Sequence, residues 1–570
     1  MKNEIATGIQ DFESLRMNKR FYVDKTVFIR EWWNGGDVAT LITRPRRFGK
    51  TLNMSTLNCF FSNKYENRGE LFDGLKIWED ASMREQQGKW PVVFLSFAGI
   101  KGQTYDDTMI QMKKLLTKLF LDFPELYRYE GFLTNEKLAL GSISEKMTEI
   151  DAALSLNLLS GLLQRIYGKK VLIFLDEYDT PLQEAYINGY WNELVAFTRT
   201  MFNNAFKTNS SLERGIMTGI TRVSKESIFS DLNNLTVITT TSTRYATSFG
   251  FTEEEVFQAL EDYSFTEEDK QGVKTWYNGF TFGPVTDMYN PWSITNFLKE
   301  KKLAVYWANT SSNGLVGKLL RTGRPDIKKL FEQLMKGETI QVPVDEQIIF
   351  NQLDTNPAAV WSLLLASGYL KVVHTMSLQE AFDLHMEQIY TLELTNYEVY
   401  RMFENLIKLW FAQSGGLSEF TKAMLQGDAE TMEEYLSDIM LACMNSFDGR
   451  MGPSDKIPES FYHGLVLGLL VEQEERYTIR SNRESGYGRY DVMMEPKSPD
   501  FPAVILEFKL FSSRRGEKDL EETAQNALKQ IEEKKYDAEL LSRGIPADHI
   551  LKYGLAFRGK DCLIRKGAPL

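Results

Sequence analysis

Between a strand-like segment and a helix-like segment stands the tripeptide Gly49-Lys50-Thr51, and few folds place these residues there. The segment before it, VATLIT (38–43), is a short run of apolar and β-branched residues that is typical of a buried strand. The segment after it, TLNMSTLNCFF, is typical of a helix. A loop that joins a strand to a helix presents backbone N–H groups to an anion. The sequence therefore predicts a phosphate-binding loop.

The predicted loop, TRPRRFGKT (43–51), differs from the pattern G-x-x-x-x-G-K-[ST] because Arg44 replaces the first glycine. A residue other than glycine fits this position when its φ is negative. In such loops the lysine neutralises phosphate charge and the final hydroxyl holds Mg²⁺. A plain surface role for Lys50 is the alternative. The predicted nucleotide contacts are Arg44, Pro45, Arg46, Arg47, Phe48, Gly49, Lys50 and Thr51, with Thr51 also a metal ligand.

A second signal is VLIFLDEYDTPL, an apolar run that ends in Asp176 and Glu177. We expect Asp176 to orient the metal ion and Glu177 to polarise an attacking water. The alternative is that both acids only cap the next segment. Because the two motifs occur in the expected order, each after a strand, nucleotide binding is favoured. Hydrolysis is less strongly indicated, because it also needs a polar sensor and often an arginine at the γ-phosphate. Candidates for contact with the γ-phosphate follow the run GIMTGIT: Thr218, Thr221 and Arg222.

Strand-like and helix-like runs alternate through the first part of the chain, which predicts an α/β fold with a mostly parallel sheet. The expected strands are 38–43, 91–97, 170–176 and 213–221. The pattern then becomes mostly helical, and it changes again after FDGRMGPSDKIP (447–458), a predicted linker. The predicted domains are a P-loop α/β domain at 1–250, a mostly helical region at 251–450 and a second α/β domain at 451–570.

The C-terminal part carries a second group of charged residues, in which Glu507 and Lys509 occupy the apolar run VILEFKL. Residues two apart on a strand project to the same side, and a hairpin brings Asp491 of RYDVMME beside them. Two carboxylates can hold a divalent cation while a lysine stabilises phosphate charge. A structural ion pair is the alternative. His463, on the preceding helix, is a further candidate metal ligand, although a packed core histidine is the more common case.

Several long motifs resemble a known family. They are RFYVDKT, TRPRRFGKT, LDEYDTPL, TGITRVSKESIFSDLNNL, WYNGFTFG and YNPWSITNFL. Together they resemble the AAA-ATPase-like family whose members carry a C-terminal PD-(D/E)XK nuclease-superfamily domain. The resemblance implies that a loop opened by arginine is the usual form, and that Gln530 accompanies the D…E-x-K residues in the catalytic site. Asn290 and Trp292 belong to the family signature, but their sequence context gives no physical role.

The leading functional hypothesis is an ATP-binding protein, with ATP hydrolysis expected, coupled to a Mg²⁺-dependent nuclease that acts on nucleic acid, with DNA favoured over RNA. The alternative is a nucleotide-dependent switch whose nuclease fold is a non-catalytic binding module. The net charge of −12 favours this alternative somewhat, because phosphate binding needs a basic face. A homo-oligomeric ring is also kept open, with Arg222 acting across an interface.

The expected location is the cytoplasm. No apolar run is long enough to span a membrane, and three widely separated cysteines fit reduced thiols. No membrane partner is expected.

Overall fold

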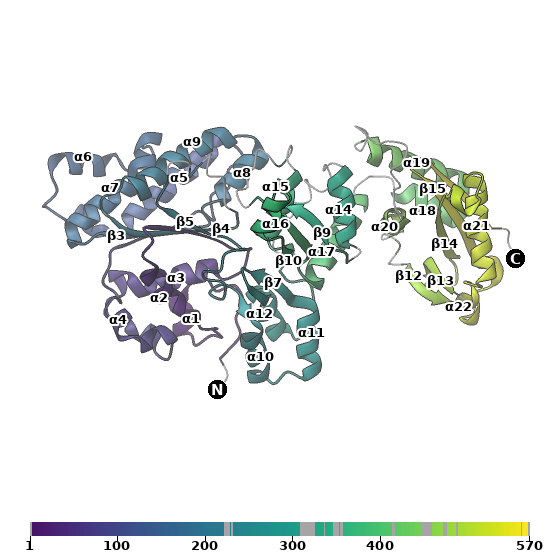
Figure 1. Cartoon of the computed structure of the whole chain (residues 1–570), viewed down its shortest axis with the longest axis horizontal. Coiled ribbons are helices and arrows are strands. Elements are labelled where there is room, and N and C mark those ends of the chain that lie inside the picture. The colour runs from purple at the N-terminus through teal and green to yellow at the C-terminus, as the bar shows by residue number, and fades with distance from the viewer. Residues whose placement is uncertain are drawn as a thin grey trace. The chain divides into compact units, whose positions relative to one another are not determined.

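The computed structural model (Figure 1) describes residues 3–221, 228–229, 232–307, 325–335, 337–345, 353, 357–412, 417–445, 459–470, 473, 476–485, 488–559 and 561–567. The chain forms two compact units, Met1–Arg401 and Met402–Leu570. The predicted linker at 447–458 lies outside the described residues. The predicted three-part division stays a prediction.

A parallel five-stranded sheet organises the first unit, as predicted from the alternating pattern. Its order is β2-β3-β4-β1-β5. The strands are β1 (Ala39–Thr43), β2 (Val92–Ser96), β3 (Val171–Asp176), β4 (Leu212–Gly219) and β5 (Leu235–Ile238). Because β4 lies between β1 and β3, the carboxyl ends of all three meet at one edge of the sheet.

Helices cover both faces of this sheet (Figure 1). One set contains α1 (Phe12–Met17), α2 (Val27–Gly35), α3 (Lys50–Phe61) and α4 (Ala81–Arg84). The other contains α5 (Tyr105–Leu121), α6 (Thr134–Ser142), α7 (Glu149–Tyr167), α8 (Thr180–Asn188) and α9 (Trp191–Phe202). Alternation along β3 divides the core, since Phe174 packs in the cluster with α2 and α3 whereas Ile173 packs in the cluster with α5 and α7.

The middle of the chain is helical, as predicted, and also holds two small antiparallel sheets that the sequence pattern did not reveal. The helices are α10 (Glu253–Asp262), α11 (Glu267–Tyr277), α12 (Pro291–Glu300), α14 (Pro325–Met335), α15 (Pro357–Ala366), α16 (Leu378–Asp383) and α17 (Tyr397–Ala412). One sheet contains β6 (Phe251–Thr252), β8 (Val285–Tyr289) and β7 (Asn278–Phe282). The other contains β10 (Leu370–Thr375), β11 (Ile389–Leu394) and β9 (Ile340–Pro343).

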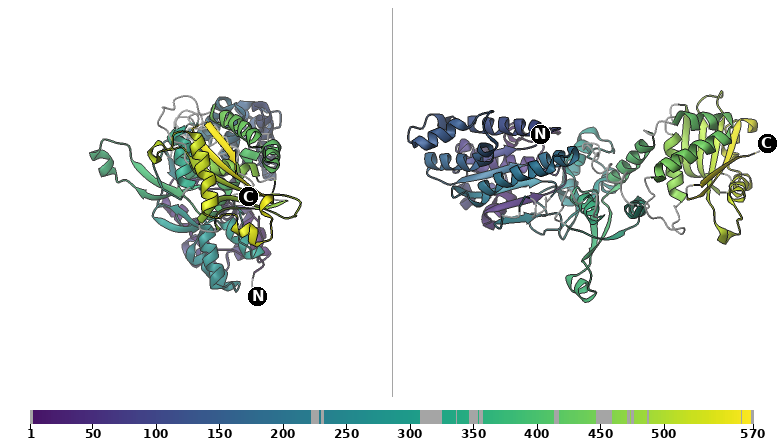
Figure 2. Two further views of the ribbon diagram at one scale, coloured as in Figure 1. Left: turned by 90° about the vertical axis from the view of Figure 1, so that its right-hand side faces the viewer. Right: turned by 90° about the horizontal axis from the view of Figure 1, so that it is seen from above.

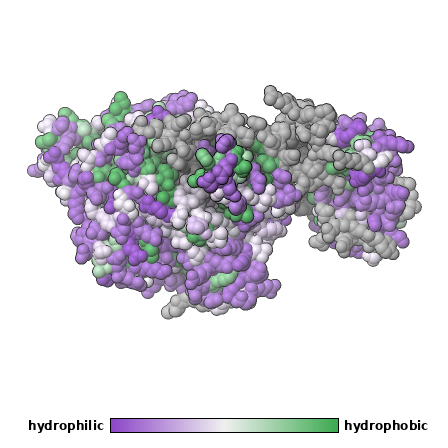
Figure 3. Space-filling model, in the orientation of Figure 1, coloured by the Kyte–Doolittle hydropathy of each residue, from purple (hydrophilic) through white to green (hydrophobic). Residues whose placement is uncertain are grey.

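The surface of the first unit is mainly hydrophilic on the face shown in Figure 3, with small hydrophobic groups over its helices. A hairpin of β10 and β11, with α16 at its tip, projects from this unit (Figure 2). Leu378 and Phe382 of α16 are 75% and 73% exposed. Within the described ranges, no helix has both the length and the apolar character needed to cross a membrane.

The second unit is built on a mixed sheet of order β12-β13-β14-β15-β16, in which only the pairing of β14 with β15 is parallel. Its strands are β12 (Tyr477–Ser485), β13 (Gly488–Pro496), β14 (Ala503–Leu510), β15 (Ile550–Arg558) and β16 (Asp561–Lys566). Its helices are α18 (Leu417–Gln426), α19 (Ala429–Asn445), α20 (Glu459–Leu470), α21 (Leu520–Glu533) and α22 (Ala538–Ser542). The predicted order of helix, three strands, helix and strand is present, with β16 added at the edge.

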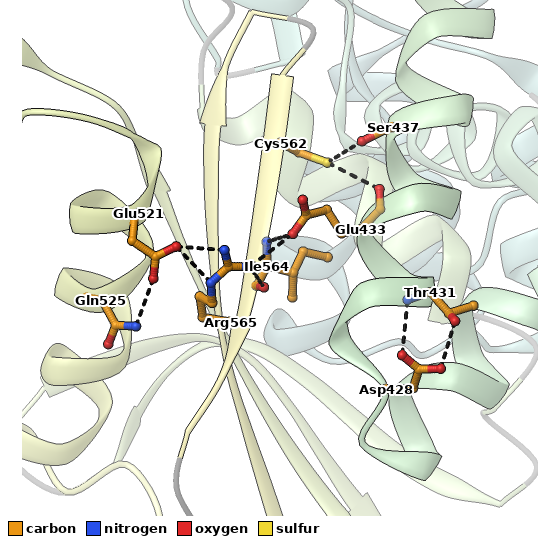
Figure 4. A network of polar contacts seen from close by, with 9 residues as sticks. All are labelled: Asp428, Thr431, Glu433, Ser437, Glu521, Gln525, Cys562, Ile564 and Arg565. Carbon is orange, nitrogen blue, oxygen red and sulfur yellow. Dashed lines mark hydrogen bonds and ion pairs between the residues drawn. The ribbon is translucent and has the colours of Figure 1, made fainter.

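A polar network fastens helices to this edge strand (Figure 4). Arg565 of β16 donates to Glu521 of α21 at 2.8 Å and to Glu433 of α19 at 3.2 Å. The thiol of Cys562, on the same strand, lies 3.3 Å from the hydroxyl of Ser437 of α19. Burial raises the pKa of Cys562 to about 11. The thiol therefore stays protonated at neutral pH, which fits a packed structural cysteine.

Candidate active sites

The predicted phosphate loop joins β1 to α3, as its sequence context indicates. Gly49 precedes the first residue of α3 and has φ 81°, in the left-handed region. A Cβ on Gly49 would meet no atom within 4 Å, so the backbone conformation rather than lack of space favours glycine. The loop ends at the N-terminus of α3, whose free N–H groups favour an anion.

Lys50 lies inside this loop, with only 5% of its surface exposed. Its ammonium donates to the carbonyl oxygens of Arg44 at 2.9 Å and Pro45 at 2.7 Å. Burial lowers the pKa of Lys50 to about 8, although the carboxylates of Glu177 and its neighbours act in the opposite direction. A positive charge that has only neutral acceptors as hydrogen-bond partners is well placed to attract a phosphate.

Asp176 accepts hydrogen bonds from two of the predicted polar side chains at the edge of the sheet. Its Oδ2 accepts from Thr51 Oγ1 at 2.9 Å, and its Oδ1 accepts from Thr218 Oγ1 at 2.6 Å. Asp176 and Thr218 are fully buried. A carboxylate beside a threonine hydroxyl is a set of hard oxygen donors, which fits Mg²⁺. The three residues come together because β4 lies between the strands that carry the other two motifs.

Glu177 follows Asp176 and has φ 52°, an uncommon conformation for a residue with a side chain. The hydroxyl of Thr180 donates to its Oε2 at 3.3 Å. Strained backbone of this kind often occurs at functional sites. The structure thus places Glu177 beside the metal-binding candidates, and its role with an attacking water stays a prediction.

Asp179 is a site residue that the sequence reasoning missed. Its Oδ2 accepts hydrogen bonds from the N–H groups of Ile220 and Thr221 and from the Thr221 hydroxyl, each at 2.9 Å. Asp179 therefore fixes the backbone just after β4. Both the N–H and the hydroxyl of Thr221 bind Asp179. The third acid of DEYD (176–179) was the available signal. Arg222, the other candidate here, lies outside the described residues.

Arg44, which replaces the glycine of the motif, has a completely buried side chain. Its guanidinium donates to the carbonyl oxygens of Thr43 at 2.8 Å, Thr239 at 2.7 Å and Tyr245 at 3.3 Å. It also lies 4.7 Å from the centre of the Phe282 ring. Burial lowers the pKa of Arg44 to about 9. The side chain therefore ties the loop to the protein interior, and only its carbonyl contacts Lys50.

Replacing Arg44 by glycine, which restores the common motif, is expected to lower the free energy of unfolding by about 3 kcal/mol. The change removes a buried side chain and leaves several carbonyl groups without their donor. Denaturant unfolding measures the effect. Arg47→Gly is the matched control, because Arg47 is exposed and has φ 63°, which glycine adopts more easily. Equal stability of Arg44→Gly and the native protein would contradict a structural role for the guanidinium.

The rest of the loop contacts neighbouring helices and the middle of the chain. Arg46 donates to Gln183 of α8 at 3.2 Å, and the buried Phe48 ring lies 4.7 Å from that of Phe280. The guanidinium of Arg47 lies 4.6 Å from the centre of the Trp292 ring. Trp292 thus has a physical role beside the loop that its sequence context did not supply.

The C-terminal site forms where β13 and β14 separate. Val492 and Leu506 are the last residues paired at this end of the two strands. Beyond them, Asp491 Oδ2 accepts from the backbone N–H of Phe508 at 2.7 Å. Burial raises the pKa of Asp491, while the Phe508 N–H, His463 and Lys509 act to lower it. The Asp491 carboxylate therefore replaces a backbone acceptor at the end of the ladder.

Gln530 of α21 links the remaining predicted residues. Its amide nitrogen donates to Glu507 Oε1 and, at 3.0 Å, to the Tyr536 hydroxyl. Its amide oxygen accepts from Lys509 Nζ at 2.6 Å. The Asp491 and Glu507 carboxyl groups lie within hydrogen-bonding reach of each other. The structure thus brings Asp491, Glu507, Lys509 and Gln530 together.

His463 contacts this group differently from the prediction. Its Nε2 lies 3.1 Å from the backbone oxygen of Asp491, and its ring packs on Phe508 at 5.4 Å. Among the residues that the structure describes, no three His, Cys, Asp or Glu side chains form a group that could hold a metal. Mg²⁺ keeps several waters and needs only one or two carboxylates. The Asp491 and Glu507 pair therefore fits a divalent cation, whereas a ligand role for His463 stays a prediction.

Two family models match this chain, one over the region of the phosphate loop and one over the region of the C-terminal site. Residues 6–229 match the family model described as predicted AAA-ATPase, and residues 457–567 match that of the PD-(D/E)XK nuclease superfamily. An uncharacterized protein from the vnfD 5′ region of Azotobacter chroococcum mcd 1 is 26% identical over 379 residues, which are 65% of this chain and 64% of that protein. The match thus spans less than two thirds of that relative.

Two ATPases are among the solved structures that are similar to this chain. The Walker-type ATPase of Pyrococcus abyssi gives a TM-score of 0.37 at 12% identity, over 67% of this chain and 95% of that chain. A signal transduction ATPase with numerous domains from Pyrococcus horikoshii, which has a tetratricopeptide repeat sensor, gives 0.25 at 14% identity, over 78% and 53%.

Proposed function

Because the chain combines an AAA-ATPase-like domain with a domain of the PD-(D/E)XK nuclease superfamily, we propose that it is a nucleotide-regulated nuclease. ATP bound at the phosphate loop controls the cleavage of nucleic acid phosphodiesters at the C-terminal site, with DNA as the favoured substrate. Mg²⁺ is the favoured cation at both sites, because both present carboxylate oxygens, joined at the phosphate loop by the Thr51 hydroxyl.

The observation that carries this proposal is the hydrogen-bonded group around Gln530. Gln530 directs its oxygen to Lys509 and its nitrogen to Glu507, so it fixes the lysine beside the carboxylate. A divalent cation held by the two carboxylates would supply an activated water and neutralise phosphate charge. Lys509 would stabilise charge on the phosphodiester or orient the water. A purely structural ion pair does not require a glutamine that bridges both partners.

The first unit supports nucleotide control. Lys50 offers a positive charge inside the loop, and Thr51 already contacts Asp176. Glu177, one residue beyond Asp176, supplies the candidate base for hydrolysis of the bound nucleotide. Nucleotide binding and hydrolysis are separate steps of the proposal, because binding rests on the loop whereas hydrolysis also needs Glu177.

The test is a cleavage assay on single-stranded DNA, double-stranded DNA and RNA, with Mg²⁺ or Mn²⁺, with and without ATP. The native protein is expected to cut at least one substrate, and Glu507→Gln is expected to lose this activity. Glu517→Gln is the matched control, since Glu517 is another buried carboxylate, bonded to Ser512 N and the Thr523 hydroxyl. Its activity is expected to persist.

Failure to cut any substrate, combined with retained nucleotide binding, would contradict the nuclease proposal. It would favour a nucleotide-dependent switch whose C-terminal fold recognises nucleic acid without cleaving it.

A further inference from the structure

One backbone carbonyl of the phosphate loop is held from outside the loop. Arg46 O accepts from the indole N–H of Trp307 at 2.9 Å and from the side-chain amide of Asn290 at 3.2 Å. A carbonyl oxygen has two lone pairs, so these two donors fill its hydrogen-bonding capacity. The donors come from positions 244 and 261 residues further along the chain.

This arrangement also sets the direction of a loop N–H group. The Arg46 carbonyl and the Arg47 N–H belong to one planar peptide unit. Fixing the carbonyl oxygen between Asn290 and Trp307 therefore fixes the direction of the Arg47 N–H, which points the opposite way within that plane. Backbone N–H groups of this loop are the expected phosphate ligands. The two side chains thus orient a loop N–H group through the backbone, because both donate to the carbonyl of the same peptide unit.

Each donor is itself anchored. Asn290 caps α12, because its side-chain oxygen accepts from Trp292 N at 2.8 Å and Ser293 N at 3.4 Å. Trp307 is held by Glu398, whose Oε1 accepts from the backbone N–H of Trp307 at 2.6 Å. The other oxygen of Glu398 accepts from the Ser293 hydroxyl at 2.8 Å. One buried carboxylate therefore fixes both segments that hold the loop.

Glu398 lies in the first turn of α17, and α17 continues past the limit between the two units at Arg401 and Met402. We propose that Asn290 and Trp307 are positioning residues of the nucleotide site, and that Glu398 links the Arg46–Arg47 peptide to α17. Nucleotide binding thereby changes the stability of the helix that leads into the second unit. This inference rests on the proposed nucleotide binding and not on nuclease activity.

The first test separates the loop contact from other roles of the same side chains. Trp307→Phe keeps an aromatic ring but removes the N–H donor. Asn290→Ser keeps a good helix cap and removes the amide donor. Each variant is expected to bind a fluorescent, non-hydrolysable ATP analogue about fivefold more weakly, as loss of one hydrogen bond predicts. Trp361→Phe, which changes another buried tryptophan of the same region, is expected to bind normally.

The second test follows hydrogen exchange of α17 with and without the analogue, by mass spectrometry. The native protein is expected to show a nucleotide-dependent change in exchange, and Glu398→Ala is expected to lose it. Glu398→Gln keeps an oxygen acceptor for the Trp307 N–H and is expected to restore the response. A merely structural contribution of Glu398 would lower protection equally with and without nucleotide.

The outcomes separate the inference from the proposed function. If the native protein binds the analogue but Trp307→Phe and Asn290→Ser bind it as well as the native chain, the positioning role is wrong. An unchanged α17 response in Glu398→Ala would overturn the link to that helix. Failure of the native protein to bind the analogue would remove the basis of both the inference and the nucleotide part of the proposal. The cleavage assay tests the nuclease part independently.

Discussion

Replacement of Lys50 by methionine is expected to weaken nucleotide binding by at least about 100-fold, equivalent to about 2.7 kcal/mol. The charged group lies inside the phosphate loop, and methionine has a similar unbranched shape without the charge. The unligated variant is expected to be at least as stable as the native chain, because burial already opposes the charge of Lys50. Binding of a fluorescent ATP analogue and denaturant unfolding measure the two effects.

Stability and nucleotide affinity are expected to change in opposite directions with pH. The pKa of Lys50 is lowered from 10.5 to about 8 in the folded chain. Between these values the unfolded chain binds more protons, so Lys50 makes the free energy of unfolding rise with pH. Nucleotide affinity is expected to fall over the same range, because the ammonium loses its proton. The difference between native protein and Lys50→Met isolates both effects from other titrating groups.

Lys114→Met, at an exposed lysine of α5, is the control for this experiment. It is expected to leave both nucleotide affinity and its pH dependence unchanged. Retention of native affinity by Lys50→Met would show that the loop does not bind phosphate in the way proposed. A large loss of stability in the unligated variant would show instead that the ammonium mainly supports the two loop carbonyls.

Local sequence patterns were sufficient for the parts of the fold that local physics determines. The apolar run before Asp176 predicted a buried strand, and the strand, loop and helix around Gly49 predicted the geometry of the phosphate loop. The spacing of Glu507 and Lys509 also predicted that both side chains reach one site. In each case the side-chain direction follows from the periodicity of a single element.

Contacts between distant segments could not be predicted in this way. The burial of the Arg44 side chain depends on Thr239 and Tyr245, which belong to a part of the chain far from the loop. The role of Asn290 likewise depends on the carbonyl of Arg46. The two small sheets of the middle region have strands of only two to six residues, too short for a clear periodic pattern.

The position of His463 shows a finer limit. The sequence predicted that His463 lies on the helix before the strands. It could not show that the His463 Nε2 lies beside the Asp491 carbonyl rather than beside a carboxylate. That choice depends on how the helix rotates against the sheet and on packing with Phe508. The ring therefore contacts the backbone of the site through the Asp491 carbonyl.

Replacement of Asp491 by asparagine is expected to reduce phosphodiester cleavage by about 100- to 1,000-fold while raising the stability of the cation-free protein. Asparagine keeps an oxygen that accepts from Phe508 N–H but carries no charge. Burial raises the pKa of Asp491, so the folded chain holds its proton more strongly than the unfolded chain. The free energy of unfolding therefore falls as pH rises through this range, and at neutral pH the charge costs stability.

Thermal unfolding with and without Mn²⁺ or Mg²⁺ distinguishes this prediction from simple damage to the fold. The cation is expected to raise the Tm of the native protein and not that of Asp491→Asn, since only the native pair of carboxylates binds it. A variant that is both inactive and less stable would indicate that the carboxylate has a structural role. A variant that is inactive, more stable and insensitive to the cation has lost chemistry alone, because misfolding cannot raise the Tm.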